Sequence, residues 1–176
     1  MQAPVRSSFV ERMIGAARLD SEVYEEVEHD RGATRQAALV VVLSAAAAGV
    51  AAFFTIGFGG LIFISLFALI SWALYAYLTY FIGTRLLAGP DTSADWGELA
   101  RTLGFAQAPG VLAIVGVVPA VAIVAGAVIS IWLMFTTVVA LRAALDFTTG
   151  RAIGTALLGW LALGAVRAVI YAALVS

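Results

Sequence analysis

Residues 36–84 read QAALVVVLSAAAAGVAAFFTIGFGGLIFISLFALISWALYAYLTYFIGT, which is 49 consecutive positions without Asp, Glu, Lys or Arg. A second uncharged stretch of 40 residues runs from Thr102 to Leu141. A soluble domain needs charge on its surface, whereas a charged side chain at the centre of a membrane costs roughly 2.5–3.5 kcal/mol on insertion scales. The two stretches therefore predict an all-α, polytopic integral membrane protein.

The composition supports this class. The 176 residues are 62% hydrophobic and 12% charged, with a mean hydropathy of +1.02, so the spans use most of the chain and leave no room for a separate soluble domain. The absence of cysteine excludes disulfides, thiolate metal sites and cysteine nucleophiles. The net charge of -1 gives no indication of a nucleic-acid partner.

Each uncharged stretch is long enough for two spans, since one span needs about 20 apolar residues. Glycines at 57–60 interrupt the first stretch, and Pro119 interrupts the second. One helix over 104–141 would be about 57 Å long, well beyond a ~30 Å hydrocarbon core, which disfavours a four-span alternative. We therefore predict a five-helix bundle with short amphipathic cytoplasmic helices. Its expected parts are a segment 1–35 and a membrane domain 36–176, with spans near 36–56, 61–83, 104–118, 124–141 and 153–174.

The arginines predict the orientation. All ten basic residues are arginines, and nine of them lie before the first span or in the connections 85–101 and 142–151. The positive-inside rule then places the N-terminus in the cytoplasm and the C-terminus on the opposite side of the cell inner membrane. No cleaved signal peptide is visible, so the first span is expected to act as an uncleaved anchor.

Residues 1–35 contain two predicted helices. Ser8 and Glu11 have the spacing of a capping box, and the apolar residues that follow form one side of a short amphipathic helix. This helix is expected to lie on the inner membrane surface or to pack against the ends of the spans. A second helix begins near Asp20 and carries five acidic residues, interpreted as a solvated face. His29 is the single histidine and is expected to be solvent-exposed, so the sequence predicts no metal site and no cofactor.

The connection before the third span contains a candidate structural motif. Asp95 and Glu98 again have capping-box spacing, and Glu98 is expected to pair with Arg101 on one helix face. An interfacial tryptophan fits the membrane boundary. The amide of Gln107 is expected to satisfy backbone groups freed by Pro109. The motif consists of Trp96, Glu98, Arg101, Gly104, Gln107 and Pro109.

The same stretch, Trp96-Gly97-Glu98-Leu99-Ala100-Arg101-Thr102-Leu103-Gly104-Phe105-Ala106-Gln107-Ala108-Pro109-Gly110, resembles the membrane domain of the bacterial Yip1 family. So do Pro119, Ile131-Trp132, the run from Ala140 to Leu145, and the region 22–36. The resemblance implies five spans and a cytoplasmic N-terminus. The Asp-Leu-Tyr-Gly-Pro signature of eukaryotic relatives is absent, so their link to vesicle traffic and small GTPases is not carried over.

Catalytic groups are scarce inside the spans. No Asp, Glu or His lies in any of them, and the hydroxyl groups there are interpreted as helix–helix hydrogen-bonding groups. Arg167 is the exception, because an ionisable residue inside a span is a candidate functional site. It either snorkels to the outer interface or forms an anion, lipid-headgroup or pore-lining site. Gly164, Ala168 and Ala172 form a small-residue stripe beside it that suits close helix contact.

Three functional hypotheses follow. The first is a non-enzymatic membrane scaffold that works through helix packing and through lipid or protein partners. The second is a small transporter or channel subunit with Arg167 in a polar path. A membrane enzyme is the least favoured. The expected partners are membrane lipids, with a membrane-protein partner or a second copy of the chain, and no nucleic acid.

Overall fold

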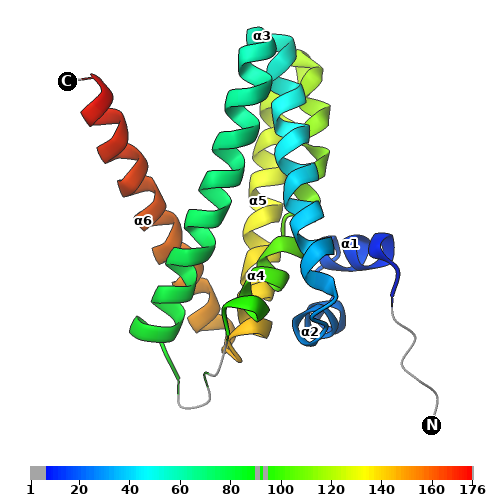
Figure 1. Cartoon of the computed structure of the whole chain (residues 1–176), viewed down its shortest axis with the longest axis vertical. Coiled ribbons are helices and arrows are strands. Elements are labelled where there is room, and N and C mark those ends of the chain that lie inside the picture. Colours follow the sequence, from blue (N-terminus) through cyan, green and yellow to red (C-terminus); the bar gives the residue numbers. More distant parts are fainter. Residues whose placement is uncertain (1–6, 90–91, 93–94, 176) are drawn as a thin grey trace.

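A computed structural model describes residues 7–89, 92 and 95–175, with only the backbone described for 174 and 175. This part of the chain is helical and contains no strand, which confirms the all-α class (Figure 1). The elements are α1 (Phe9–Ala17), α2 (Ser21–His29), α3 (Ala33–Phe81), the π-helical turn η1 (Ile82–Leu86), α4 (Trp96–Phe105), the 3-10 helix η2 (Ala108–Val117), α5 (Pro119–Ala144) and α6 (Thr149–Val175).

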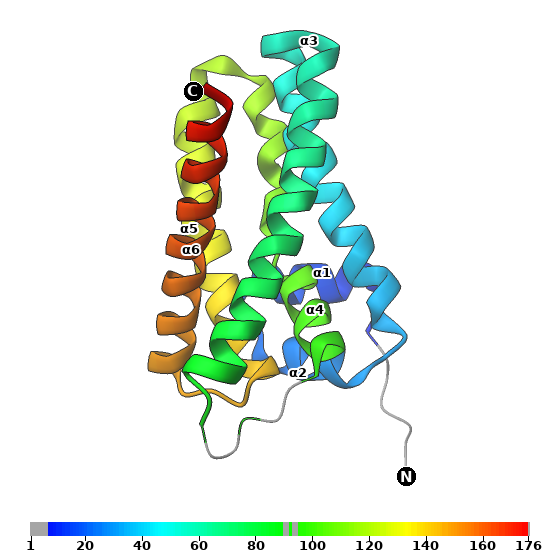
Figure 2. The same ribbon diagram turned by 60° about the vertical axis from the view of Figure 1, so that its left-hand side comes forward.

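Helix α3 is a hairpin of two helices. Its backbone leaves helical geometry at Ile56 and Gly57, and Gly57 has a φ of 72°, a conformation that only glycine adopts without strain. The chain then returns alongside itself (Figure 2). Gly49 permits the two arms to approach, because a side chain there would collide with Ser65 and the carbonyl of Leu61. The break falls at the glycine cluster where the sequence predicts it.

Four helical stretches are long and apolar enough to cross a membrane: Ala33–Leu86, Trp96–Val117, Pro119–Ala144 and Thr149–Ala173. The first has 54 residues and contains the α3 hairpin, so it supplies the first two predicted spans. The chain is therefore a helical membrane bundle, and the count of five separate crossings stays a prediction.

The third predicted span, 104–118, is not a regular α-helix. Helix α4 ends at Phe105, and η2 continues as a 3-10 helix up to Val117. A 3-10 helix rises about 2.0 Å per residue and is narrower than an α-helix. Residue 109 is a proline and lacks the N–H that an α-helical turn would use. Gly110 lies against Ser44, and a narrow helix suits this close approach. The predicted break falls at Pro119, which itself begins α5, before the expected start of the fourth span near 124.

The two ends of the bundle differ in character. We call the end formed by α1, α2, α4 and the turn 145–148 the charged end, because every described charged residue except Arg167 lies there or in an adjoining helix turn. The opposite end, with the turns at Gly57 and Val118, is the apolar end. The buried core lies at the charged end and includes Tyr24, Leu99, Leu103, Phe105, Leu141 and Leu145. Toward the apolar end, large apolar side chains are exposed, as expected for a lipid-facing surface.

Candidate functional site

A cavity of about 550 Å³ lies between the second arm of α3, α5 and α6. Its volume is within the range of small-molecule binding sites. Most of its wall is apolar, but several side chains present hydroxyl or amide groups, and one presents a guanidinium. The lining consists of Ala68, Ser71, Trp72, Tyr75, Gln107, Ser130, Leu133, Thr137, Trp160, Leu163, Gly164 and Arg167.

Helix α6 closes the cavity on the side of the charged end. The hydroxyl of Tyr75 donates to the carbonyl of Ala156 at 3.3 Å. Gly159 lets α6 approach α3, since a Cβ there would lie 2.7 Å from Cγ2 of Thr79. Beyond this contact α6 diverges from α3 toward its C-terminus (Figure 1). The cavity is therefore closed at one end, and its rim contains the exposed residues Gly164 and Arg167.

Arg167 stands at the rim, about 27 Å along α6 from Thr149 at 1.5 Å per residue. Its side chain is exposed, and its Cζ lies 4.9 Å from the centre of the Phe67 ring on α3. This is cation–π distance. Arg167 forms no ion pair with any residue that the structure describes. The guanidinium is thus held beside the cavity by an aromatic ring and keeps its charge available.

Gln107 reaches the cavity because other groups satisfy the backbone near Pro109. Thr136 donates to the carbonyl of Ala106 at 2.8 Å, and Trp72 donates to the carbonyl of Leu103 at 3.4 Å. Thr136 and Trp72 thus satisfy backbone carbonyls near Pro109, the role predicted for the Gln107 amide. In the described part of the chain no hydrogen bond of that amide is found, and the half-buried side chain lines the cavity.

The small-residue stripe on α6 makes no close helix contact where it is described. Gly164 and Ala168 are exposed, and open space surrounds the position of a Cβ at residue 164. Close contact between α6 and α3 occurs at Gly159 instead, one turn nearer the charged end. The described stripe is therefore exposed, and its Gly164 lies at the cavity.

The motif 96–109 has a structural role at the charged end. Arg101 is buried and donates from Nε to the carbonyls of Val27 and Glu28 at 3.0 and 3.1 Å, so it caps the C-terminal turn of α2 instead of pairing with Glu98. Glu98 forms the predicted capping box with Asp95. At Gly104, helix α4 crosses α3 closely, since a Cβ at residue 104 would lie 2.8 Å from the Cβ of Ala37.

Trp96 and Pro109, the remaining members of that motif, occupy different environments. Trp96 is exposed and stacks edge-on against Tyr80, with ring centres 5.7 Å apart. Its half-exposed ring at the end of the bundle fits the predicted interfacial position. Pro109 is buried in the first turn of η2.

An ion network at the charged end was missed from the sequence. Arg12 is only 2% exposed and contacts Glu26 at 2.7 Å and Asp30 at 2.8 Å, with a further hydrogen bond to Gln36 at 2.9 Å. Burial alone would raise the pKa of Glu26, but hydrogen bonds from Arg12 and Ser7 hold it below its usual value. The capping-box spacing of Ser8 and Glu11 correctly predicts the start of α1. Nothing in that spacing identifies which arginine becomes buried.

Helix α1 adopts one of its two predicted placements, against the ends of the long helices. Ala16 is buried, and the indole of Trp132 on α5 donates to the carbonyl of Ala17 at 2.6 Å, so the helix packs against the bundle. Val10 and Ile14 are exposed on its other side. This apolar side is available to a membrane surface.

The cavity offers binding groups rather than a catalytic set. Among its lining residues there are hydroxyls, an amide and one guanidinium, but no carboxylate or imidazole that could act as a general base at neutral pH. Such an arrangement can bind an anion that carries an apolar part.

Comparison with protein families gives one match and two negative results. The family described as Yip1 domain matches residues 20–170, which covers the cavity and all of the charged end except α1. Comparisons with curated proteins and with solved structures give no match. The fold is that of a multi-pass integral membrane protein, and the chain belongs to the Yip1 domain family.

Proposed function

We propose that this chain is a non-enzymatic, membrane-organising protein that binds an anionic amphiphile, such as an acidic phospholipid, in the cavity between α3, α5 and α6. The observation that carries the proposal is an arginine that has no ionic partner among the described residues and lies at the rim of a mostly apolar cavity. A guanidinium binds phosphate through paired, charge-assisted hydrogen bonds. The apolar wall below Arg167 would accommodate an acyl chain.

The position of Arg167 supports a lipid rather than a soluble anion. The residue lies on α6 among exposed apolar side chains, including Val169 and Ile170, and α6 diverges from α3 at this level. A ligand would thus enter sideways from the membrane. An unpaired charge within a span is costly, and a headgroup that neutralises it offsets part of that cost.

Native mass spectrometry of the purified protein tests this function. We expect the wild type to retain anionic lipid, Arg167→Leu to lose it, and Arg167→Lys to retain it partly because lysine keeps the charge but not the paired geometry. Arg85→Leu, which removes an exposed arginine at the charged end, is the matched control and should retain the lipid. Equal retention by a folded Arg167→Leu variant would reject the proposal.

We further propose that the charged end lies in the cytoplasm, as the positive-inside rule predicts. The chain has no native cysteine, so single cysteines report cleanly. Gly59 and Gly150 are suitable positions because open space surrounds both. A membrane-impermeant maleimide added to whole cells should label Gly59→Cys and leave Gly150→Cys unlabelled. The reverse pattern would invert the orientation.

A transporter is the second candidate, and the polar side chains of Ser71, Gln107 and Thr137 in the cavity favour it. Transport requires the cavity to open in turn toward each side. Ser71→Cys is a conservative reporter of this opening. Labelling from both sides of the membrane would favour transport, whereas labelling from one side or neither supports a binding site that stays closed by the contact of Tyr75 with Ala156.

A further inference from the structure

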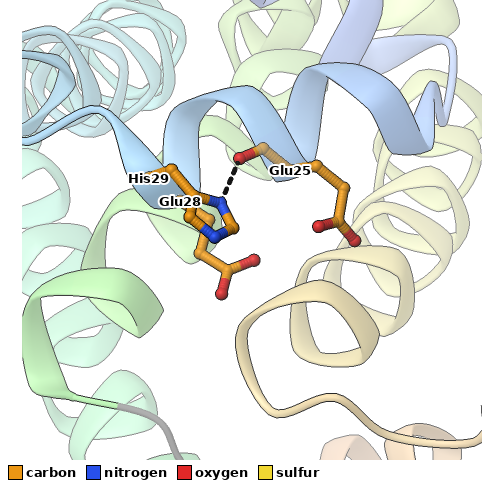
Figure 3. A group of neighbouring side chains, drawn as sticks. All are labelled: Glu25, Glu28 and His29. Atoms are coloured by element: carbon orange, nitrogen blue, oxygen red, sulfur yellow. Dashed lines mark hydrogen bonds between the residues drawn. The ribbon is translucent and has the colours of Figure 1, made fainter.

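Three potential metal ligands gather on one face of α2, far along the chain from the cavity residues. Glu28 and His29 follow Glu25 by three and four residues, so both lie on the side of the helix that carries Glu25 (Figure 3). One ligand atom from each lies within 4.8 Å of the others. Ligand atoms around a tetrahedral Zn²⁺ are roughly 3.3 Å apart for bonds of about 2 Å. Glu25 is exposed, so its side chain has room to rotate toward this spacing.

Glu28 gives an independent reason to look for a cation here. Its side chain is buried, with 8% exposure, and its Oε2 has no hydrogen-bond partner among the described residues. A buried carboxylate oxygen without a partner is destabilising. Arg101 does not compensate it, because this guanidinium donates to the backbone carbonyls of Val27 and Glu28. A bound cation would account for the burial of this carboxylate.

The charges around Glu28 also favour a cation. Glu25 on the same helix, Asp146 in the turn after α5 and Glu98 on α4 all contribute negative potential at Glu28, and His29 contributes positive potential. Two helices and one turn therefore direct negative charge at one point on the charged end.

His29 is oriented in the manner of a metal ligand. Its Nδ1 lies 2.9 Å from the backbone carbonyl of Glu25. A carbonyl oxygen only accepts, so Nδ1 carries the proton and the neutral ring keeps its lone pair on Nε2. Metal-binding histidines commonly use such a carbonyl contact to fix the ring and its tautomer.

We propose that Glu25, Glu28 and His29 bind a divalent first-row transition-metal ion, with Zn²⁺ as the reference ion. One imidazole nitrogen and two carboxylate oxygens suit Zn²⁺, Co²⁺, Ni²⁺ or Mn²⁺, whereas Ca²⁺ requires six to eight oxygen ligands. Water would complete the coordination. The ion would join the last turn of α2 to the acidic groups of α4 and of the α5–α6 turn, and so would strengthen the charged end. This proposal is independent of lipid binding at Arg167.

The test is isothermal titration of the full-length protein in detergent with Zn²⁺ and, separately, Co²⁺. The protein should carry no polyhistidine tag and should be treated first with chelator. We expect one ion per chain for the wild type and a rise in its unfolding temperature on binding. Glu28→Gln and His29→Ala should each weaken binding by about tenfold or more. Both changes preserve the helix, and the exposure of His29 makes its replacement safe for folding.

Glu22→Gln is the matched control, because it removes one exposed acidic charge from the same helix but lies outside the cluster. It should bind within about twofold of the wild type, as expected for an exposed charge screened by salt. Saturable binding lost only in the cluster variants supports the proposal. It is overturned by absence of saturable binding, by equal weakening in Glu22→Gln, or by competition from Mg²⁺ at the same concentration as Zn²⁺.

Discussion

Arg12 and Arg167 show how differently the two ends of this molecule use the same side chain. Arg12, at the charged end, is fully enclosed and satisfied by Glu26, Asp30 and Gln36. Arg167, toward the apolar end, has an aromatic ring beside it and no acidic partner in the described chain. The first arginine contributes to folding. The second is left available, and its surroundings favour binding a ligand.

The largest expected effect comes from breaking the ion network. Arg12→Ala removes the guanidinium that contacts Glu26 and Asp30, and removing one member of a buried ion pair typically costs 3–5 kcal/mol. We expect about 3 kcal/mol, because the side chain of Glu26 retains 28% exposure. Chemical unfolding in detergent measures this loss in the free energy of unfolding. Arg18→Ala, at an exposed position of the same region, should change stability by less than about 0.5 kcal/mol. Similar losses of stability for both variants would show that the buried ion network of Arg12 contributes no more than an exposed arginine.

Arg101 gives the next largest effect. Arg101→Met keeps much of the side-chain volume but removes the donors that reach the carbonyls of Val27 and Glu28. We expect a loss of about 2 kcal/mol in the free energy of unfolding, since hydrogen bonds from charged groups contribute roughly 1.5–3 kcal/mol. The exposed Arg142→Met is the control. Increased amide hydrogen exchange confined to α2 would identify the lost cap as the cause.

Two glycines sharpen the comparison between the ends. Gly104→Ala places a methyl group 2.8 Å from Cβ of Ala37, and overpacking of this kind costs about 1–3 kcal/mol. Gly164→Ala meets open space and should be neutral or stabilising by up to about 1 kcal/mol, because alanine favours a helix over glycine. Thermal unfolding of both variants tests this. Destabilisation by Gly164→Ala would indicate that α6 packs against another chain.

The pH dependence is the smallest effect. Because the pKa of Glu26 is lowered in the folded protein, the unfolded state binds more protons than the folded state below the ordinary value of 4.5. This contribution is therefore fully present above pH 4.5 and is lost as the pH falls through the folded pKa. Glu26→Gln should flatten the acid limb of the stability profile. An unchanged acid limb in that variant would show that other carboxylates dominate it.

Much of the fold could be predicted from the sequence because membranes impose simple rules. Charge-free runs predict helices, and Gly57 and Pro119 break them where expected. The 3-10 form of η2 could not be predicted, since it depends on the close approach of Gly110 to Ser44 across the bundle. The same holds for the carbonyl contacts of Thr136 and Trp72, which free Gln107 for the cavity.

The candidate sites were partly visible in the sequence. Arg167 stands out because a lone charge in a span is rare. The cavity beside it depends on the angle between α6 and α3, which no local pattern specifies. In the sequence His29 is an isolated histidine next to acidic residues. The burial of Glu28 by neighbouring helices distinguishes this cluster from a solvated acidic face, and the sequence does not show that burial.

The most direct test of the central claim is quenching of tryptophan fluorescence by lipids with brominated chains. Trp72 and Trp160 line the cavity, and Trp160→Phe identifies the component that reports from the α6 side of the cavity. We predict that brominated anionic lipid quenches this component at about one tenth of the membrane fraction needed for brominated zwitterionic lipid, since a charge-assisted contact contributes about 1.5–3 kcal/mol. This preference should disappear in Arg167→Leu and persist in Arg85→Leu. Equal quenching by both lipids in the wild type, or an unchanged preference in Arg167→Leu, would contradict the account.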